Sequence, residues 1–128
     1  MGGNIGITSM TIVVRGLATG KIAVKQLRKV VLKELSIAMI LGLLYGGILM
    51  LLAYVQFGEV SYLGFVAGLS MFISMIMAAA IGTLMPIFLQ LIKVDPAVAT
   101  GPFVTSTVDS LGILVYLVAV IAIVAIVS

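Results

Sequence analysis

The chain has 128 residues, with 63% hydrophobic and 9% charged side chains, a net charge of +3 and a mean hydropathy of +1.41. Soluble domains carry about 25% charged residues, so this composition excludes a chain surrounded mainly by water. Cysteine and histidine are absent, which excludes disulfides, thiolate or imidazole metal sites, and Cys/His or Ser/His catalysis within the chain. A metal ion bound here needs oxygen ligands, which hard cations such as Mg²⁺, Ca²⁺ and Mn²⁺ prefer. We therefore expect no enzyme.

The apolar segments predict an all-α fold, a polytopic helical membrane protein with four transmembrane helices in one domain, residues 1–128. The helices are expected at about residues 4–19, 34–55, 62–92 and 102–127. The second and fourth are long enough to cross a hydrocarbon layer of about 30 Å, whereas the first is short and comparatively polar. The third is too long for one straight span at about 1.5 Å per residue, so we expect it to tilt, or to kink near Gly82 and Pro86.

Polar residues of the first segment fall on one helical face. Asn4, Thr8, Thr11 and Arg15 follow the spacing i, i+4, i+7, i+11, which places them in one stripe. We expect this stripe to face water or a second polar stripe, and the apolar remainder to face lipid. The alternative for hydroxyl and amide groups of this kind is hydrogen bonding between neighbouring helices.

The segment at residues 20–33 is basic and has helical spacing. Its cations are Lys21, Lys25, Arg28, Lys29 and Lys33. They predict an interfacial amphipathic helix on the cytoplasmic leaflet, with the positive side chains near lipid phosphates. This face either marks the membrane topology and contacts lipid, or serves as a docking surface for a regulatory domain. Because most of the positive charge clusters in one loop between apolar segments, it does not indicate a nucleic-acid partner.

The distribution of positive charge also predicts the orientation of the chain in the cell membrane. The loop at 20–33 is basic, the turn at 56–61 carries no lysine or arginine, and the next connector carries Lys93. The basic loops are expected in the cytoplasm, which places both termini of this chain outside. An N-terminus at Met1 would then cross the membrane ahead of a weak first helix without a signal peptide, so we expect a further helix upstream in the native protein.

Two shorter features concern helix ends. Asp95-Pro96 has the pattern of an N-cap followed by proline at the first helical position, which predicts one helical turn in the connector. Gly101-Pro102 then breaks this turn and begins the last helix. Glu34, beside Lys33 at the mouth of the second helix, either suits the N-terminus of that helix or adds negative charge to an inner vestibule.

The most informative residue is Asp109, which is followed by an almost unbroken apolar sequence. An aspartate at the centre of a membrane helix costs roughly 2.5–3.5 kcal/mol on insertion scales, and such acids usually face a bundle interior or a water-filled path. Thr105, Asp109, Gly112 and Tyr116 share one helical face by their spacing. Asp109 is therefore a candidate cation site. The alternative is a structural ion pair with Arg15, the one formal cation placed to reach it.

Several of these motifs together resemble the membrane domain of the MgtE family of magnesium channels and transporters. The resemblance spans essentially the whole chain. It rests on Gly2-Gly3-Asn4-Ile5-Gly6, Val14-Arg15-Gly16-Leu17-Ala18, Lys33-Glu34, Asp95-Pro96-Ala97, Gly101-Pro102-Phe103-Val104-Thr105 and Asp109-Ser110-Leu111-Gly112 with Tyr116. One position departs from the family pattern, because Thr8 stands where the family usually has glutamine.

The resemblance implies a homodimer with one central pore, lined by helices that match the first and last segments. It implies that Asp109 is the pore carboxylate, that Thr105 and Gly101 follow towards the cytoplasm, and that Asp95 lies near the inner mouth. The candidate pore-lining residues are Asn4, Thr8, Thr11, Gly112 and Tyr116. Family members have five membrane helices, and bacterial members carry cytosolic magnesium-sensing domains. The resemblance therefore implies an upstream helix and cytosolic regulatory domains that are not part of this chain.

These observations predict divalent cation transport, with Mg²⁺ as the transported ion and Mn²⁺, Co²⁺ or Ca²⁺ as alternatives that the residues alone do not separate. Mg²⁺ gives up its waters reluctantly and is usually bound through one or two carboxylates. We therefore expect the paired Asp109 carboxylates of a homodimer in the lipid bilayer to hold a hydrated ion. Two other functions stay open: a sodium-coupled divalent cation exchanger on the same scaffold, and a non-transporting membrane scaffold in which Asp109 pairs with Arg15.

Overall fold

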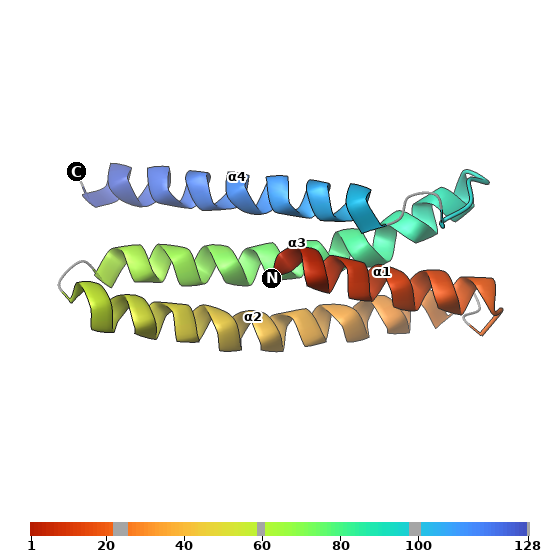
Figure 1. Ribbon diagram of the computed structural model, residues 1–128, viewed down its shortest axis with the longest axis horizontal. Helices are drawn as coiled ribbons and strands as arrows, with labels where there is room; N and C mark the ends of the chain where they lie inside the picture. Colours follow the sequence, from red (N-terminus) through yellow and green to blue (C-terminus); the bar gives the residue numbers. More distant parts are fainter. Residues whose placement is uncertain (22–25, 59–60, 98–100, 128) are drawn as a thin grey trace.

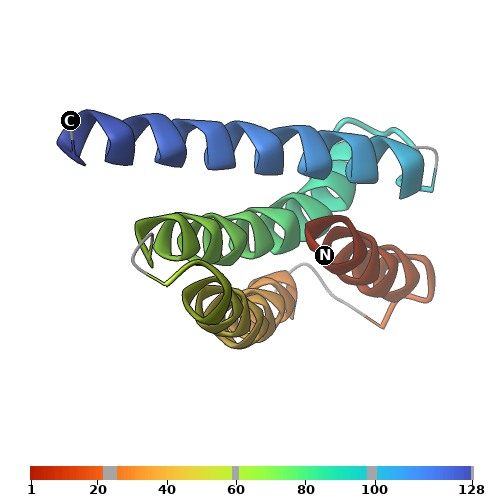
Figure 2. The ribbon, with the colours of Figure 1, turned by 60° about the vertical axis from the view of Figure 1, so that its left-hand side comes forward.

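The computed structural model describes residues 1–21, 26–58, 61–97 and 101–127. These residues form helices and no strand: α1 (Gly2–Ala18), α2 (Leu27–Phe57), α3 (Ser61–Leu91) and α4 (Gly101–Val127). Figure 1 and Figure 2 show α2, α3 and α4 lying lengthwise beside one another, whereas α1 covers only one half of the bundle and begins near its middle. The predicted all-α fold is confirmed.

Three of the described helices, α2, α3 and α4, are long and apolar enough to cross a membrane. The remaining helix, α1, has 17 residues. At about 1.5 Å per residue it measures roughly 25 Å, which is less than the roughly 30 Å of a hydrocarbon layer. Over the residues described, three of the four predicted transmembrane helices are identified as candidate spans, and α1 is the shortest helix.

Glycines bring α2 and α3 into close contact. A Cβ placed on Gly46 would lie 2.7 Å from the carbonyl oxygen of Gly68, and a Cβ placed on Gly68 would lie 2.7 Å from the carbonyl oxygen of Gly46. Gly42 and Gly64 make similar approaches to the facing helix. Because these positions carry no side chain, the two backbones pack directly on each other, as the small-residue spacing of both helices predicts.

A small apolar core holds α1 against α3 and α4. Its buried members are Met10, Ala78, Val104 and Val108. The closest point between α1 and α3 lies beside this core, where a Cβ placed on Gly82 would collide with the carbonyl oxygen of Gly6. This packing sets α1 between the start of α4 and the second half of α3, and so determines which face of α1 is left exposed.

The basic segment differs from the prediction. Residues 27–33 form the first two turns of α2 rather than the end of a separate interfacial helix at 20–33. Residues 22–25 of that predicted helix lie outside the described residues. The physical reason is that no glycine or proline interrupts the sequence between Leu27 and Gly42, so the helix continues back through the basic residues.

The long helix α3 is one α-helix of 31 residues that contains Pro86. Its last turns incline towards the start of α4 in both views, Figure 1 and Figure 2. Proline lacks the backbone donor of a regular helix. Near it, the buried hydroxyl of Thr83 donates a hydrogen bond to the carbonyl oxygen of Ala79 at 2.8 Å. The third helix was predicted to tilt, or to kink near Gly82 and Pro86. The structure shows that α3 inclines and stays one continuous helix through Pro86.

Candidate cation site

Asp109 lies eight residues into α4 and faces α1. A Cβ placed on Gly3 would be 3.2 Å from Oδ1 and 3.7 Å from Oδ2 of Asp109, so the carboxylate rests on the first turn of α1. The amino-terminal turn of a helix presents free backbone N–H groups and the positive end of the helix dipole, both of which favour a nearby negative charge. Glycine at position 3 provides the space in which the carboxylate lies.

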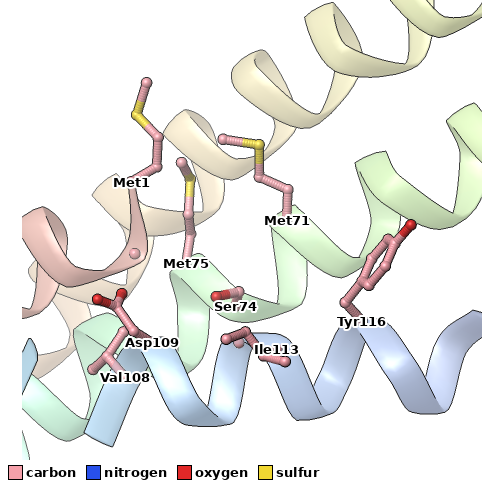
Figure 3. Close-up of a pocket in the computed structure, with 10 residues that line it drawn as sticks. Met1, Met71, Ser74, Met75, Val108, Asp109, Ile113 and Tyr116 are labelled. Atoms are coloured by element: carbon pink, nitrogen blue, oxygen red, sulfur yellow. The ribbon is translucent and has the colours of Figure 1, made fainter. Parts of the chain in front are cut away.

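The carboxylate of Asp109 is exposed and borders a hollow of about 560 Å³ between α1, α3 and α4. Figure 3 shows the carboxylate directed away from α4 towards the first turn of α1, with the ring of Tyr116 two turns further along the same helix. The other residues that line the hollow include Gly2, Met71, Ser74, Met75, Val108, Gly112 and Ile113. Asp109 is thus a charged group on the wall of an open, mostly apolar hollow.

The predicted polar stripe of α4 is present on one face. Asp109, Gly112 and Tyr116 line the same hollow. Thr105 contacts the same residue of α1 as Asp109 does, because a Cβ placed on Gly3 would lie 3.1 Å from Cγ2 of Thr105. The spacing of these residues therefore predicted correctly that they share a face, and this face is turned towards α1 and α3.

Near the start of α4, the candidate residues make local hydrogen bonds. The hydroxyl of Thr105 donates to the carbonyl oxygen of Gly101 at 2.7 Å. In the connector, Oδ1 of Asp95 accepts a hydrogen bond from the backbone N–H of Ala97 at 2.9 Å, as expected for an N-cap. The helical turn predicted after Asp95 falls partly on residues 98–100, which lie outside the described residues. Asp95 is exposed and does not line the hollow beside Asp109.

The polar stripe of α1 is exposed along its length, at Asn4, Thr8, Thr11 and Arg15. The hydroxyl of Thr8 donates to the carbonyl oxygen of Asn4 at 2.8 Å, and that of Thr11 donates to the carbonyl oxygen of Ile7 at 2.7 Å. These two hydroxyls bond within their own helix, so the alternative of bonds between helices is not realised for them. The four stripe residues do not line the hollow beside Asp109.

Arg15 cannot neutralise Asp109 within one chain. The carboxylate of Asp109 rests on Gly3, and Arg15 follows Gly3 by twelve residues on the same continuous helix. This separation corresponds to a rise of about 18 Å along the helix axis, which is beyond the reach of an arginine side chain. The alternative of a structural ion pair between these two residues therefore fails within one chain.

Ser74 of α3 is a polar residue of this site that the sequence analysis missed. A Cβ placed on Gly112 would lie 2.8 Å from the Oγ atom of Ser74, and a Cβ placed on Gly2 would lie 3.2 Å from it. The hydroxyl thus reaches the backbones of α4 and α1 and borders the same hollow as Asp109. The one available signal was the pair Ser70 and Ser74, four residues apart in an otherwise apolar helix.

The donor groups at this site suit a hydrated cation. Within the described ranges, no three Asp, Glu, His or Cys side chains gather into a group that could hold a metal ion directly. One chain contributes a single carboxylate, that of Asp109, with hydroxyl groups nearby. Mg²⁺ demands octahedral geometry, dehydrates reluctantly and usually keeps several waters. A carboxylate that binds through those waters needs no protein cage.

The fold and the exposed carboxylate define the class of this chain, a polytopic helical membrane protein with a polar site beside its shortest helix. The family model MgtE, described as a divalent cation transporter, matches residues 1–119. The chain therefore belongs to the MgtE family, as its motifs predicted. The family is one of transporters and not of enzymes.

Three curated relatives carry the name magnesium transporter MgtE. The protein of Bacillus subtilis (strain 168) is 33% identical over 116 residues, which cover 91% of this chain and 26% of the relative. That of Thermus thermophilus is 33% identical over 121 residues, which cover 91% of this chain and 25% of the relative. That of Enterococcus faecalis is 32% identical over 114 residues, with 89% and 25% covered. The chain spans about a quarter of the length of these relatives.

Proposed function

We propose that this chain forms a path for Mg²⁺ across the cell membrane, as a homodimer whose two Asp109 carboxylates hold the hydrated ion between them. The observation that carries the proposal is the exposed carboxylate of Asp109 on the wall of a hollow, in an otherwise apolar helix. A charge in such a helix is unfavourable unless it meets water, an ion or an opposite charge. Arg15 of the same chain is too distant to be that charge, and the relatives are named for magnesium transport.

A second copy is part of the proposal because one chain leaves its polar groups uncovered. The stripe of α1 and the carboxylate of Asp109 are both exposed, and none of residues 109–126 of α4 is buried. A two-fold axis beside α1 and α4 would bring the stripes of both copies to one space and would double the number of carboxylates. Lipid would cover the remaining apolar faces.

The charge of the ion explains why a pair of carboxylates favours a divalent cation. One divalent ion neutralises both carboxylates, whereas a monovalent ion leaves a negative charge in a medium that solvates it poorly. Binding through water also keeps the interaction weak enough for the ion to leave, which conduction requires. In the proposed orientation, with the loop at 20–33 in the cytoplasm, Thr105, Gly101 and Asp95 follow on the cytoplasmic side.

The test is Mg²⁺ uptake by liposomes that contain the purified protein. We expect Asp109→Asn to reduce uptake to the level of protein-free liposomes while the protein still elutes as a dimer, because the amide keeps the shape and removes the charge. Ser110→Ala, a substitution at the exposed neighbouring position, is the matched control and should transport normally. Wild-type uptake by Asp109→Asn would overturn the proposal.

Two further arms of this assay separate the proposed path from its alternatives. Uptake is expected without any sodium gradient, and a requirement for that gradient would identify a sodium-coupled exchanger instead. Competition by Mn²⁺, Co²⁺ and Ca²⁺ against Mg²⁺ measures the ion preference directly. We expect Mn²⁺ and Co²⁺ to compete better than Ca²⁺, because the larger Ca²⁺ ion takes more ligands at longer distances.

A further inference from the structure

Glu34 is the one buried acid among the acidic residues that the structure describes. Asp95 and Asp109 are exposed, whereas Glu34 of α2 keeps only 6% of its surface accessible. Its Oε2 atom accepts a hydrogen bond of 2.9 Å from the hydroxyl of Ser9 on α1. Glu34 is the eighth residue of α2, so it lies too far along the helix to stabilise the N-terminus, one of the two roles expected from the sequence.

The carboxylate of Glu34 occupies a position on the packing face of α2. The buried residues of this helix are Glu34, Ala38, Gly42 and Gly46, a stripe at every fourth position. Gly46 touches Gly68. Glu34 lies twelve residues before Gly46 on α2, and Thr83 lies fifteen residues after Gly68 on α3. Along the two helices these separations correspond to rises of about 18 and 22 Å from the contact, towards the end of the bundle where α1 lies. Glu34 therefore lies at the level where the three helices α1, α2 and α3 meet.

Among the residues that the structure describes, the bond from Ser9 to Glu34 is the only side-chain hydrogen bond that joins two helices. Within the described residues, every other side-chain hydrogen bond stays inside one helix or one turn. Apart from this bond, α1 packs chiefly against α3 and α4 and touches α2 little. A buried carboxylate without a partner is strongly unfavourable, so the pairing constrains how α1 can sit against α2.

Helix geometry links this bond to the cation site. Ser9 and Gly3 are six residues apart, which separates them by about 120° around α1 at roughly 100° per residue. They form the two edges of the buried face of α1, one against Glu34 and the other against Asp109. A rotation of α1 that broke the bond at Ser9 would also move Gly3 relative to the carboxylate of Asp109.

We propose that Glu34 is a positioning residue for the cation path, which fixes the rotation of α1 through Ser9 and thereby holds the first turn of α1 against Asp109. The inference rests on the proposed function, because it assigns to Glu34 a role in the geometry of the Asp109 site. The carboxylate acts as a hydrogen-bond acceptor in this role, and it does not contact the ion.

The first test compares substitutions that keep or remove this bond. In the liposome assay, Glu34→Leu and Ser9→Ala should raise the half-saturating Mg²⁺ concentration about tenfold, the effect expected for one hydrogen bond to a charged group. Their effects should not add in the double variant, because both remove the same bond. Glu34→Gln keeps an acceptor oxygen and should stay within about twofold of the wild type. Ser36→Ala, at an exposed serine on the same helix, is the matched control.

A second readout reports the rotation of α1 without measuring transport. The chain contains no cysteine, so a single introduced cysteine reacts alone with a small maleimide in detergent. Met10 is 6% exposed and Ile12 is 43% exposed, so Ile12→Cys should react much faster than Met10→Cys. Glu34→Leu should reduce this contrast at least about fivefold by exposing position 10, whereas Glu34→Gln should leave it unchanged.

The outcomes distinguish this inference from the proposed function. An unchanged labelling contrast in Glu34→Leu overturns the positioning role, whatever the transport result. Loss of transport in Glu34→Gln with normal labelling also overturns it, because the charge of Glu34 would then act directly. Altered labelling together with normal uptake by Asp109→Asn supports the positioning of α1 by Glu34 and rejects the cation site. Should Glu34→Leu fail to fold, Ser9→Ala provides the same two readouts.

Discussion

Helices α3 and α4 have similar hydropathy but very different surroundings. Both helices are apolar enough to cross a membrane, yet 33% of the residues in the most apolar stretch of α3 are buried, and none of those in the most apolar stretch of α4. α3 lies at the centre of the bundle and contacts each of the other three helices. α4 lies along one side, as Figure 2 shows, with much of its length uncovered. Hydropathy therefore identifies both helices as membrane segments without distinguishing their environments.

The difference follows from side-chain size. The contact residues of α3 are small at the points of closest approach, at Gly64, Gly68, Ala78, Ala79 and Gly82. Beyond Gly112, α4 consists mainly of valine, isoleucine, leucine and alanine without a further glycine. In lipid there is no hydrophobic gain from pairing two apolar helices, so close packing between small residues decides which helices associate. The pattern of small residues, rather than apolarity, determines what a membrane helix faces.

The strongest test of this comparison is Gly82→Val on α3. A Cβ at this position would collide with the backbone of Gly6, and backbone cannot move aside as a side chain can. We expect a loss of about 3 kcal/mol or more, at or above the upper range for overpacking a tight core. Thermal unfolding in detergent, followed by circular dichroism, measures this effect.

The matched control for that variant is Gly47→Val on α2. Gly47 has no atom within 4 Å of a Cβ placed on it, so the same substitution should change stability by less than about 0.5 kcal/mol, as at other surface positions. Equal unfolding temperatures for the two valine variants would contradict the importance of the contact between α1 and α3.

Gly3→Ala on α1 tests the covered part of α4, where Thr105 and Asp109 face α1. A methyl group here would lie 3.2 Å from Oδ1 of Asp109 and 3.1 Å from Cγ2 of Thr105, so these side chains must shift by tenths of an ångström. We expect the apparent affinity for Mg²⁺ to fall about tenfold, equivalent to roughly 1.4 kcal/mol. The free energy of unfolding should hardly change, because the higher helix propensity of alanine, worth about 0.5–1 kcal/mol over glycine, opposes the cost of this crowding.

Gly47→Ala controls for this gain in helix propensity, since its methyl group meets open space. It should transport like the wild type. Wild-type Mg²⁺ affinity in Gly3→Ala would indicate that the contact between α1 and Asp109 does not shape the ion site.

Much of the fold and part of the site follow from sequence patterns. The four helices and the start of α4 within one residue of Pro102 were predicted, because apolar length and helix-breaking residues are local properties. The shared face of Thr105 and Asp109 was predicted for the same reason, since helical periodicity sets it.

The other features depend on tertiary packing. The contact of Asp109 with Gly3 and the pairing of Ser9 with Glu34 join residues from different helices, and no single segment carries a signal for either. The pair Ser70 and Ser74 does not show by itself that Ser74 lies opposite Gly112 of α4, which only the packing of the two helices reveals. The extension of α2 back to Leu27 was not predicted. The charge spacing of residues 20–33 indicates a separate interfacial helix, whereas the absence of a helix breaker after Leu27 favours one continuous helix.

Gly112→Ala examines the point where α3 and α4 meet. A Cβ here would lie 2.8 Å from the hydroxyl oxygen of Ser74 and 3.8 Å from its Cβ. Because a hydroxyl group can rotate away at little cost, we expect a loss of no more than about 1 kcal/mol. Adding Ser74→Ala removes the obstructing atom, so the double variant should unfold at a higher temperature than Gly112→Ala alone. A double variant less stable than the single one would show that the hydroxyl stabilises this junction.

The smallest effect is expected at Ile121, in the uncovered half of α4. Its side chain is 68% exposed in the single chain, and lipid solvates an isoleucine or an alanine equally well in the folded and unfolded states of a membrane helix. Ile121→Ala should therefore change the unfolding free energy by less than about 0.5 kcal/mol, whereas truncating a buried isoleucine costs about 2–5 kcal/mol. Thermal unfolding is measured on both the dimer and the dissociated chain, so that an effect within one chain can be separated from an effect at the contact between two copies. A large loss in the dimer alone would place this half of α4 against the second copy, and a large loss in both forms would contradict the exposure of Ile121 in the single chain.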